Sequence, residues 1–176
     1  MPESPSRAGF AVPMVTFPGG YTISQTPVIV HSLGKHFGMV GSGDADDFVS
    51  NQLLADSADF LGEIFAGKPG IILYNYITYY FISLTIAIAD RINKWLSYFQ
   101  GKLGEKEFFL GSSHTCADYS IFAVLYLISE KLRVGSPAAS GYTIPEPLQS
   151  YMKRVHAIPV ISEMLSSVPI LPESRL

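Results

Sequence analysis

The sequence predicts a mainly α protein, in which a bundle of helices follows a short β-hairpin and one further helix. Three observations support this fold class. Behind Thr115 the chain is apolar on nearly every face as far as Leu132, which is typical of a helix in the middle of a bundle. Residues 69–89 carry no charge, and a Pro-Gly-Gly turn within residues 17–21 joins two short β-prone runs.

Composition narrows the class of protein. The chain has 176 residues, 48% of them hydrophobic, which suits one domain with a sizeable core, or one domain and a fragment. Charged residues make up 15% against a typical ~25%, and the net charge of −3 argues against broad nucleic-acid binding. One cysteine excludes an internal disulfide framework. Since the first residues lack the apolar core of a signal peptide, we expect a cytoplasmic or organellar protein that is not secreted.

The front of the chain predicts a hairpin and a helix. Residues 10–17 have the pattern of a strand, and because Pro13 cannot donate to a ladder, it places this strand at an edge or marks a special turn. Residues 21–23 form the predicted second strand. Thr26 is the expected N-cap of the next helix, with Pro27 at the first helical position.

Further helices follow along the chain. Residues 44–66 begin with three aspartates, which the helix macrodipole favours at an N-terminus. The uncharged stretch at 69–89 continues into an amphipathic helix that reaches Leu103, and its length meets the test for a membrane span. Four tyrosines and several other polar residues dilute it, so we expect a buried helix, or one that faces a ligand or a partner. Two short helices follow, over residues 147–158 and from Pro159 onward.

A capping box begins the apolar helix behind Thr115. We expect the Thr115 hydroxyl to accept a hydrogen bond from the backbone N–H of Asp118, three residues on. The Asp118 carboxylate should bond the N–H of Thr115 in return. The box therefore has a structural role.

Taken in order, these motifs resemble those of the glutathione transferase family. The segments that carry the resemblance are Val12-Pro13, Ser24-Gln25-Thr26, Phe109-Leu110-Gly111, the box of Thr115 and Asp118, and the run from Pro147 to Ile161. Val12-Pro13 resembles the Val-cis-Pro step of the family's thioredoxin-like domain. The capping box resembles that of the central helix in the family's all-α domain.

The resemblance implies four segments. They are an irregular N-terminus (residues 1–9), a partial thioredoxin-like segment (10–40), an all-α C-terminal domain (44–167) and a tail (168–176). Only eleven residues precede Val12, where the family has strand–helix–strand–helix. We therefore expect an N-terminally truncated chain without the first strand, whose Tyr, Ser or Cys activates the glutathione sulfur, and we predict no catalytic residue.

Part of a glutathione site is implied by the same resemblance. The backbone at Val12, next to Pro13, would pair with the cysteinyl peptide group of glutathione. Gln25 and Thr26, at a helix N-terminus, would hold the γ-glutamyl carboxylate. The alternative is a helix cap without a ligand and an ordinary trans proline at position 13.

Two further groups match functional positions of the family. Asp56 and Asp59 lie where an acid often reaches the glutathione amine of the neighbouring subunit, although a solvated role also fits them. Tyrosines occupy the region that lines the hydrophobic substrate pocket, and burial against helices or a partner also fits these residues: Tyr74, Tyr76, Tyr79 and Tyr80. The histidines show no ligand spacing, so we expect no metal.

The functional expectation is a glutathione-transferase-like binding or assembly subunit without catalysis of its own. A protein partner or a second copy should cover the open strand edge from Met14 to Phe17, because bare edges attract other chains. Association with a membrane complex stays open. One alternative is an active transferase that conjugates glutathione to an electrophile, if the missing strand is supplied or the sequence is incomplete. The other is a carrier of a hydrophobic small molecule.

Overall fold

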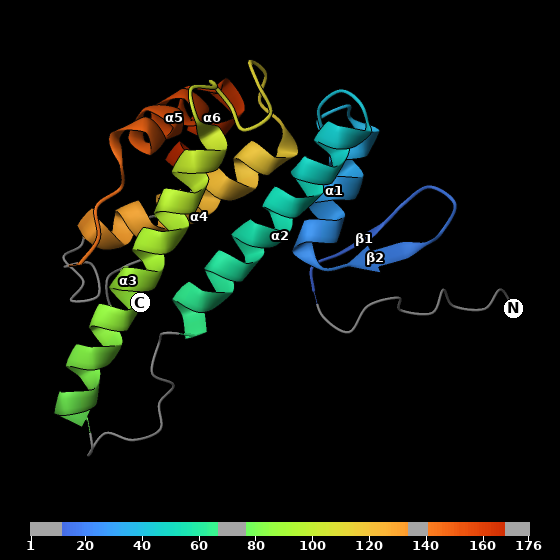
Figure 1. The fold of residues 1–176 in the computed structure, drawn as a ribbon. Coiled ribbons are helices and arrows are strands. Elements are labelled where there is room, and N and C mark those ends of the chain that lie inside the picture. Colours follow the sequence, from blue (N-terminus) through green and yellow to red (C-terminus); the bar gives the residue numbers. More distant parts are fainter. Residues whose placement is uncertain (1–11, 67–76, 134–140, 168–176) are drawn as a thin grey trace, which may run out of the picture.

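The computed structural model describes residues 12–66, 77–133 and 141–167 (Figure 1). Two short strands, β1 (Met14–Thr16) and β2 (Thr22–Ser24), form an antiparallel hairpin in which Met14 pairs with Ser24. Helices make up most of the rest. The predicted fold class, a helical bundle preceded by a β-hairpin and one helix, is therefore confirmed.

The helices of the described part are α1 (Thr26–His36), α2 (Asp44–Ala66), α3 (Ile77–Leu103), α4 (Cys116–Arg133), α5 (Glu146–His156) and α6 (Pro159–Ser167). Figure 1 shows the hairpin and α1 at one end of the molecule, α5 and α6 at the other, and α2, α3 and α4 between them. Helix α4 packs against α1, α2 and α5. It therefore joins the two ends of the molecule.

The core is centred on α4. Ile121, Leu125 and Ile128, spaced three or four residues apart, are each 0% exposed. Aromatic side chains continue this core, since Phe109 meets Phe99 and Tyr151 edge to face. Burial of apolar side chains on this scale is the main source of folding free energy in a bundle.

The capping box differs from its predicted geometry in one bond. Asp118 Oδ2 accepts from the backbone N–H of Thr115 at 2.7 Å. The prediction that the Thr115 hydroxyl accepts from the Asp118 N–H is wrong: the hydroxyl donates to Asp118 Oδ2 at 2.9 Å, and the Asp118 N–H bonds the Thr115 carbonyl. Burial removes water from the Asp118 carboxylate and raises its pKa. A buried carboxylate needs hydrogen-bond donors from the protein, and the Thr115 hydroxyl therefore donates to it instead of accepting from the backbone.

Helix α1 begins one residue earlier than predicted. Gln25, not Thr26, is the N-cap residue, and Thr26 and Pro27 both lie in the first turn. Proline is tolerated there because the first N–H groups of a helix have no partner within it. The helix ends at His36, and Gly38, two residues on, has a positive φ of 67° that suits glycine.

The long uncharged stretch is described only in part. Helix α3 begins at Ile77, and the predicted helix before that point, with Tyr74 and Tyr76, lies outside the described residues. Tyr79 and Tyr80 lie in the first turns of α3, where the backbone alone is described. Among the described helices, none has the length and apolar character needed to cross a membrane.

Candidate functional site

The predicted glutathione ligands meet at one end of the hairpin. Met14 pairs with Ser24, so the residues that flank this pair, Val12-Pro13 on one strand and Gln25-Thr26 on the other, leave the sheet together. The Val12–Pro13 peptide bond is cis. The hairpin thus brings Val12-Pro13 close to Gln25-Thr26 at the start of α1, although the two pairs are separated in the sequence.

Gln25 has an unusual backbone conformation. Its φ of 74° makes it the one non-glycine residue with positive φ in the part of the chain that the structure describes. Such a conformation costs about 1–3 kcal/mol and clusters at ligand sites. The Gln25 carbonyl accepts from Ile29, but its exposed side chain makes no cap hydrogen bond. The amide group is therefore available to a ligand.

The electrostatics at this point favour an anion. The first turn of α1 contains no acidic residue, while Lys35 and His36 lie in its last turn. The positive end of the helix macrodipole lies at the first turn of α1. This end and the N–H groups of the first turn therefore face solvent without a counter-charge from that turn. Val12 is 83% exposed, and Thr26 is exposed as well. Both residues are therefore accessible from solvent.

One hydrogen bond and one ion pair connect α1 to α2. Asp47 Oδ1 lies 2.6 Å from His31 Nε2, and Lys35 donates to Asp47 Oδ2 at 2.8 Å. The hydrogen bond from Lys35, opposed in part by desolvation, lowers the pKa of Asp47. Sequence reasoning missed this group because its members lie on different helices, and only packing brings them together. The group fixes the helix whose N-terminus forms the candidate site.

A close contact seals the junction between α1 and the bundle. A Cβ at Gly34 would lie 2.6 Å from Cys116 Sγ, so only glycine fits there without a shift. The Cys116 N–H donates to the Met39 carbonyl at 2.8 Å, and its Sγ lies 3.5 Å from Ser50 Oγ. Burial raises the pKa of the Cys116 thiol, which therefore stays protonated at neutral pH. Cys116 serves packing at this junction.

The two acids proposed from the resemblance have different surroundings. Asp56 Oδ2 accepts from Tyr98 Oη at 2.6 Å, and Gln52 donates to the same Tyr98 oxygen. Burial, followed by the hydrogen bond to Asp56, raises the pKa of Tyr98 to about 12. Asp59 is exposed one turn along α2. A role of Asp56 and Asp59 toward a second subunit stays a prediction. The pocket role of Tyr74, Tyr76, Tyr79 and Tyr80 also stays a prediction.

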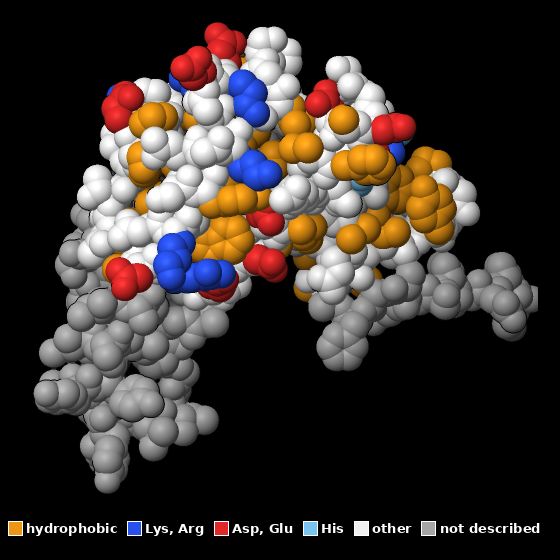
Figure 2. All heavy atoms as spheres, in the orientation of Figure 1, with side chains coloured by type: hydrophobic (Ala, Val, Ile, Leu, Met, Phe, Trp, Pro, Cys, Tyr) orange, Lys and Arg blue, Asp and Glu red, His pale blue; other side chains and the backbone are white. Residues whose placement is uncertain are grey.

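Hydrophobic side chains gather on the surface of the hairpin and α1 (Figure 2). The exposed large hydrophobic residues there are Val12, Met14, Tyr21, Val28 and Phe37. Tyr21 stacks on Phe17 at 5.3 Å between ring centroids, near the turn. Patches of this kind mark interaction sites more often than single exposed residues do. Among the described residues no group of His, Cys, Asp or Glu is arranged to hold a metal.

Comparison with known proteins agrees with this architecture. The family described as "Glutathione S-transferase, C-terminal domain" matches residues 83–168. A glutathione S-transferase of Caenorhabditis elegans superposes with a TM-score of 0.69 at 20% identity, over 91% of this chain and 75% of that one. Rat hPGDS complexed with a quinoline superposes with a TM-score of 0.66 at 22% identity, over 90% of this chain and 74% of that one. Monomeric Na-GST-3, a glutathione S-transferase of the hookworm Necator americanus, superposes with a TM-score of 0.66 at 16% identity, over 90% of this chain and 74% of that one. The search of curated proteins found no match.

These findings show that the protein has the glutathione S-transferase fold. Residues 83–168 match the C-terminal domain of the glutathione S-transferase family, and the resemblance predicted from the motifs is confirmed.

Proposed function

We propose that this chain binds glutathione at the start of α1 and acts as a binding or assembly subunit, not as a transferase by itself. The observation that carries the proposal is the strained and exposed Gln25, with φ of 74°, directly before a helix N-terminus that has no internal acid. Gln25 and the Thr26 hydroxyl would hold the γ-glutamyl carboxylate. The backbone of Val12 would pair with the cysteinyl peptide group.

The proposed ligand groups, which are the Val12 backbone, the Gln25 amide and the Thr26 hydroxyl, do not ionise near neutral pH, so none of them can act as a base. Conjugation requires the glutathione thiolate, which a nearby donor or base must stabilise. In the part of the chain that the structure describes, Cys116 is buried with a raised pKa, and Tyr21 lies near the hairpin turn, stacked on Phe17. Neither adjoins the site of Gln25 and Thr26. This supports binding over catalysis by these residues.

The exposed hydrophobic residues of the hairpin and α1 support assembly. β1 pairs with β2 alone among the described strands, so the edge from Met14 to Phe17 presents backbone groups beside apolar side chains. A protein partner or a second copy of the chain would cover this edge. Assembly is proposed from this surface and not from the fold, because Na-GST-3, which shares the fold, is monomeric.

Two measurements made together test the proposal. The rate of conjugation of an electrophilic aromatic chloride is recorded with glutathione, and retention on immobilised glutathione is recorded on the same sample. We expect retention without turnover. Turnover at a rate typical of glutathione transferases would contradict the non-catalytic role. Native mass spectrometry tests assembly, and a stable free monomer that co-purifies with no partner would contradict that part.

A further inference from the structure

The outer edge of β1 is the more open edge of the hairpin. In the part of the chain that the structure describes, β1 pairs with β2 alone. Met14 and Thr16 of β1 are exposed, whereas the residues of β2 are all half-buried. Exposed hydrophobic side chains of the hairpin and α1 lie around this edge (Figure 2).

The register of the hairpin fixes which backbone groups face this edge. The Phe17 N–H donates to the Tyr21 carbonyl at 3.0 Å, so these two residues form a hydrogen-bonded pair. Hydrogen-bonded and non-hydrogen-bonded pairs alternate along an antiparallel ladder. Val15, two residues before Phe17, therefore bonds toward β2 as well. The N–H and C=O groups of Met14 and Thr16 point the other way, to the open edge.

No charged side chain protects this edge. Between Arg7 and Lys35 the sequence contains no Lys, Arg, Asp or Glu. Natural edge strands commonly avoid pairing with other chains by carrying charged residues, lysine above all. A two-fold symmetric contact sets a surface against its own copy, so a charge near the axis would approach a like charge. A hairpin without charge therefore suits contact with a second copy of itself.

We propose that two copies of the chain pair through their β1 edges, as neighbouring antiparallel strands of one continuous sheet. The pairing rests on the assembly role proposed above and names the partner. Val15 lies at the two-fold axis, and Met14 of each copy faces Thr16 of the other, so that each pair exchanges both of its backbone bonds. Pro18 would fall opposite Val12 in this register, and because proline has no N–H the ladder ends there. Val12 thus stays available to glutathione.

Amide hydrogen exchange of the full chain tests the contact residue by residue. It is measured at a low protein concentration and at one where sedimentation shows a dimer. We expect exchange at Met14 and Thr16 to slow by at least about tenfold in the dimer. Val15 and Phe17, which bond within the hairpin, should be protected at both concentrations.

Three results of this experiment would overturn the proposal. The first is a monomer at every concentration. The second is a dimer in which the Met14 and Thr16 amides exchange freely, since the contact would then lie elsewhere. The third is protection of these amides that does not depend on concentration, because the chain would then cover its own edge.

Charge substitutions test the register. Met14→Lys and Thr16→Asp should each weaken the dimer about fivefold, because a charge enters an uncharged contact. The double variant Met14→Lys/Thr16→Asp should recover it, since this register sets each lysine opposite an aspartate. Protected Val15 and Phe17 amides show that the hairpin of each variant is intact. A double variant weaker than both single ones would overturn the register.

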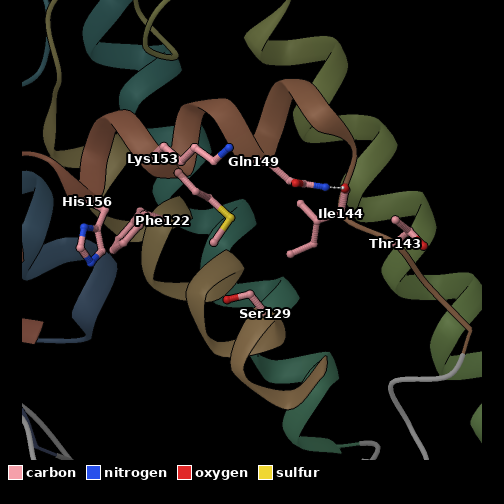
Figure 3. A pocket seen from close by; sticks show the side chains of 8 residues that line it. Phe122, Ser129, Thr143, Ile144, Gln149, Lys153 and His156 are labelled. Atoms are coloured by element: carbon pink, nitrogen blue, oxygen red, sulfur yellow. Dashed lines mark hydrogen bonds between the residues drawn. The ribbon is translucent and has the colours of Figure 1, made fainter. Parts of the chain in front are cut away.

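Matched controls carry the same substitutions away from the hairpin. They are Met164→Lys on α6, where Met164 is exposed, and Thr143→Asp at the groove between α4 and α5 (Figure 3). Both should leave the dimer unchanged. Weakening by the controls equal to that of Met14→Lys and Thr16→Asp would overturn the proposal, because the effect would then come from net charge alone.

Dimerisation and glutathione binding are read separately. Met14→Lys should weaken the dimer but keep the glutathione affinity of the unsubstituted protein, because Val12, Gln25 and Thr26 lie outside the paired segment. A monomer that binds glutathione would overturn the β1 pairing alone. A dimer that binds no glutathione would overturn only the glutathione site. A monomer that co-purifies with a different protein would overturn the β1 pairing and keep the assembly role.

Discussion

Asp118 accepts two hydrogen bonds from Thr115 through the same carboxylate oxygen, from the backbone N–H at 2.7 Å and from the hydroxyl at 2.9 Å. Its other oxygen accepts from the Phe109 N–H at 3.0 Å, and its carbonyl accepts from the Tyr151 hydroxyl at 2.7 Å. Asp118 is 0% exposed. One residue therefore ties the loop before α4, the first turn of α4 and α5 together.

Replacing this carboxylate should destabilise the fold. In Asp118→Asn one oxygen becomes an NH₂ group that faces N–H and hydroxyl donors, so at least one buried bond is lost. We expect the free energy of unfolding to fall by about 2–3 kcal/mol, measured by urea denaturation. Asp90→Asn, at an exposed position of α3, should change it by less than about 0.5 kcal/mol. Equal effects of the two substitutions would contradict the structural role of Asp118.

The junction of α1 with α4 should not tolerate a side chain at position 34. A Cβ at Gly34 would lie 2.6 Å from Cys116 Sγ and 3.1 Å from Val40 Cγ1. Gly34→Ala should lower the free energy of unfolding by about 1–3 kcal/mol through overpacking. Gly62→Ala is the control, because a Cβ there meets nothing within 4 Å. It should stabilise α2 by about 0.5–1 kcal/mol, and a loss of similar size at both positions would refute the close contact.

Tyr98 should titrate late. Its pKa is raised from 10.0 to about 12, so an alkaline absorbance titration of the protein minus that of Tyr98→Phe should show one tyrosine ionising near pH 12. Between the unfolded and folded values only the unfolded state loses this proton, and the stability that Tyr98 contributes is lost as pH rises through that interval. Asp56→Asn should lower the Tyr98 pKa, whereas Asp59→Asn should not. A value near 10 in the unsubstituted protein would contradict both the burial of Tyr98 and its hydrogen bond to Asp56.

Local patterns in the sequence predicted the fold class well. The apolar run behind Thr115 and the capping residues act within a few positions of one another, and their outcome, helix α4, depends little on the rest of the chain. The hairpin was predicted from its turn for the same reason, although β1 begins at Met14 and residues 10–11 of the predicted strand lie outside the described residues. Short-range physics therefore accounts for what was predicted.

Features that depend on packing were missed. The bonds of Asp47 to His31 and Lys35 join residues 16 and 12 positions apart on different helices, and no spacing rule connects them. The direction of the Thr115 hydroxyl bond was also missed, since it follows from the burial of Asp118 and not from the motif.

The central claim is that glutathione binds at Gln25. The most direct measurement is a calorimetric titration of glutathione into the protein and into Gln25→Gly. Glycine adopts a φ of 74° without strain and removes the amide. We expect saturable one-site binding to the unsubstituted protein and to Gln100→Ala, an exposed control on α3, with binding about tenfold weaker or lost in Gln25→Gly. The absence of saturable binding, or equal affinity of Gln25→Gly, would contradict the claim.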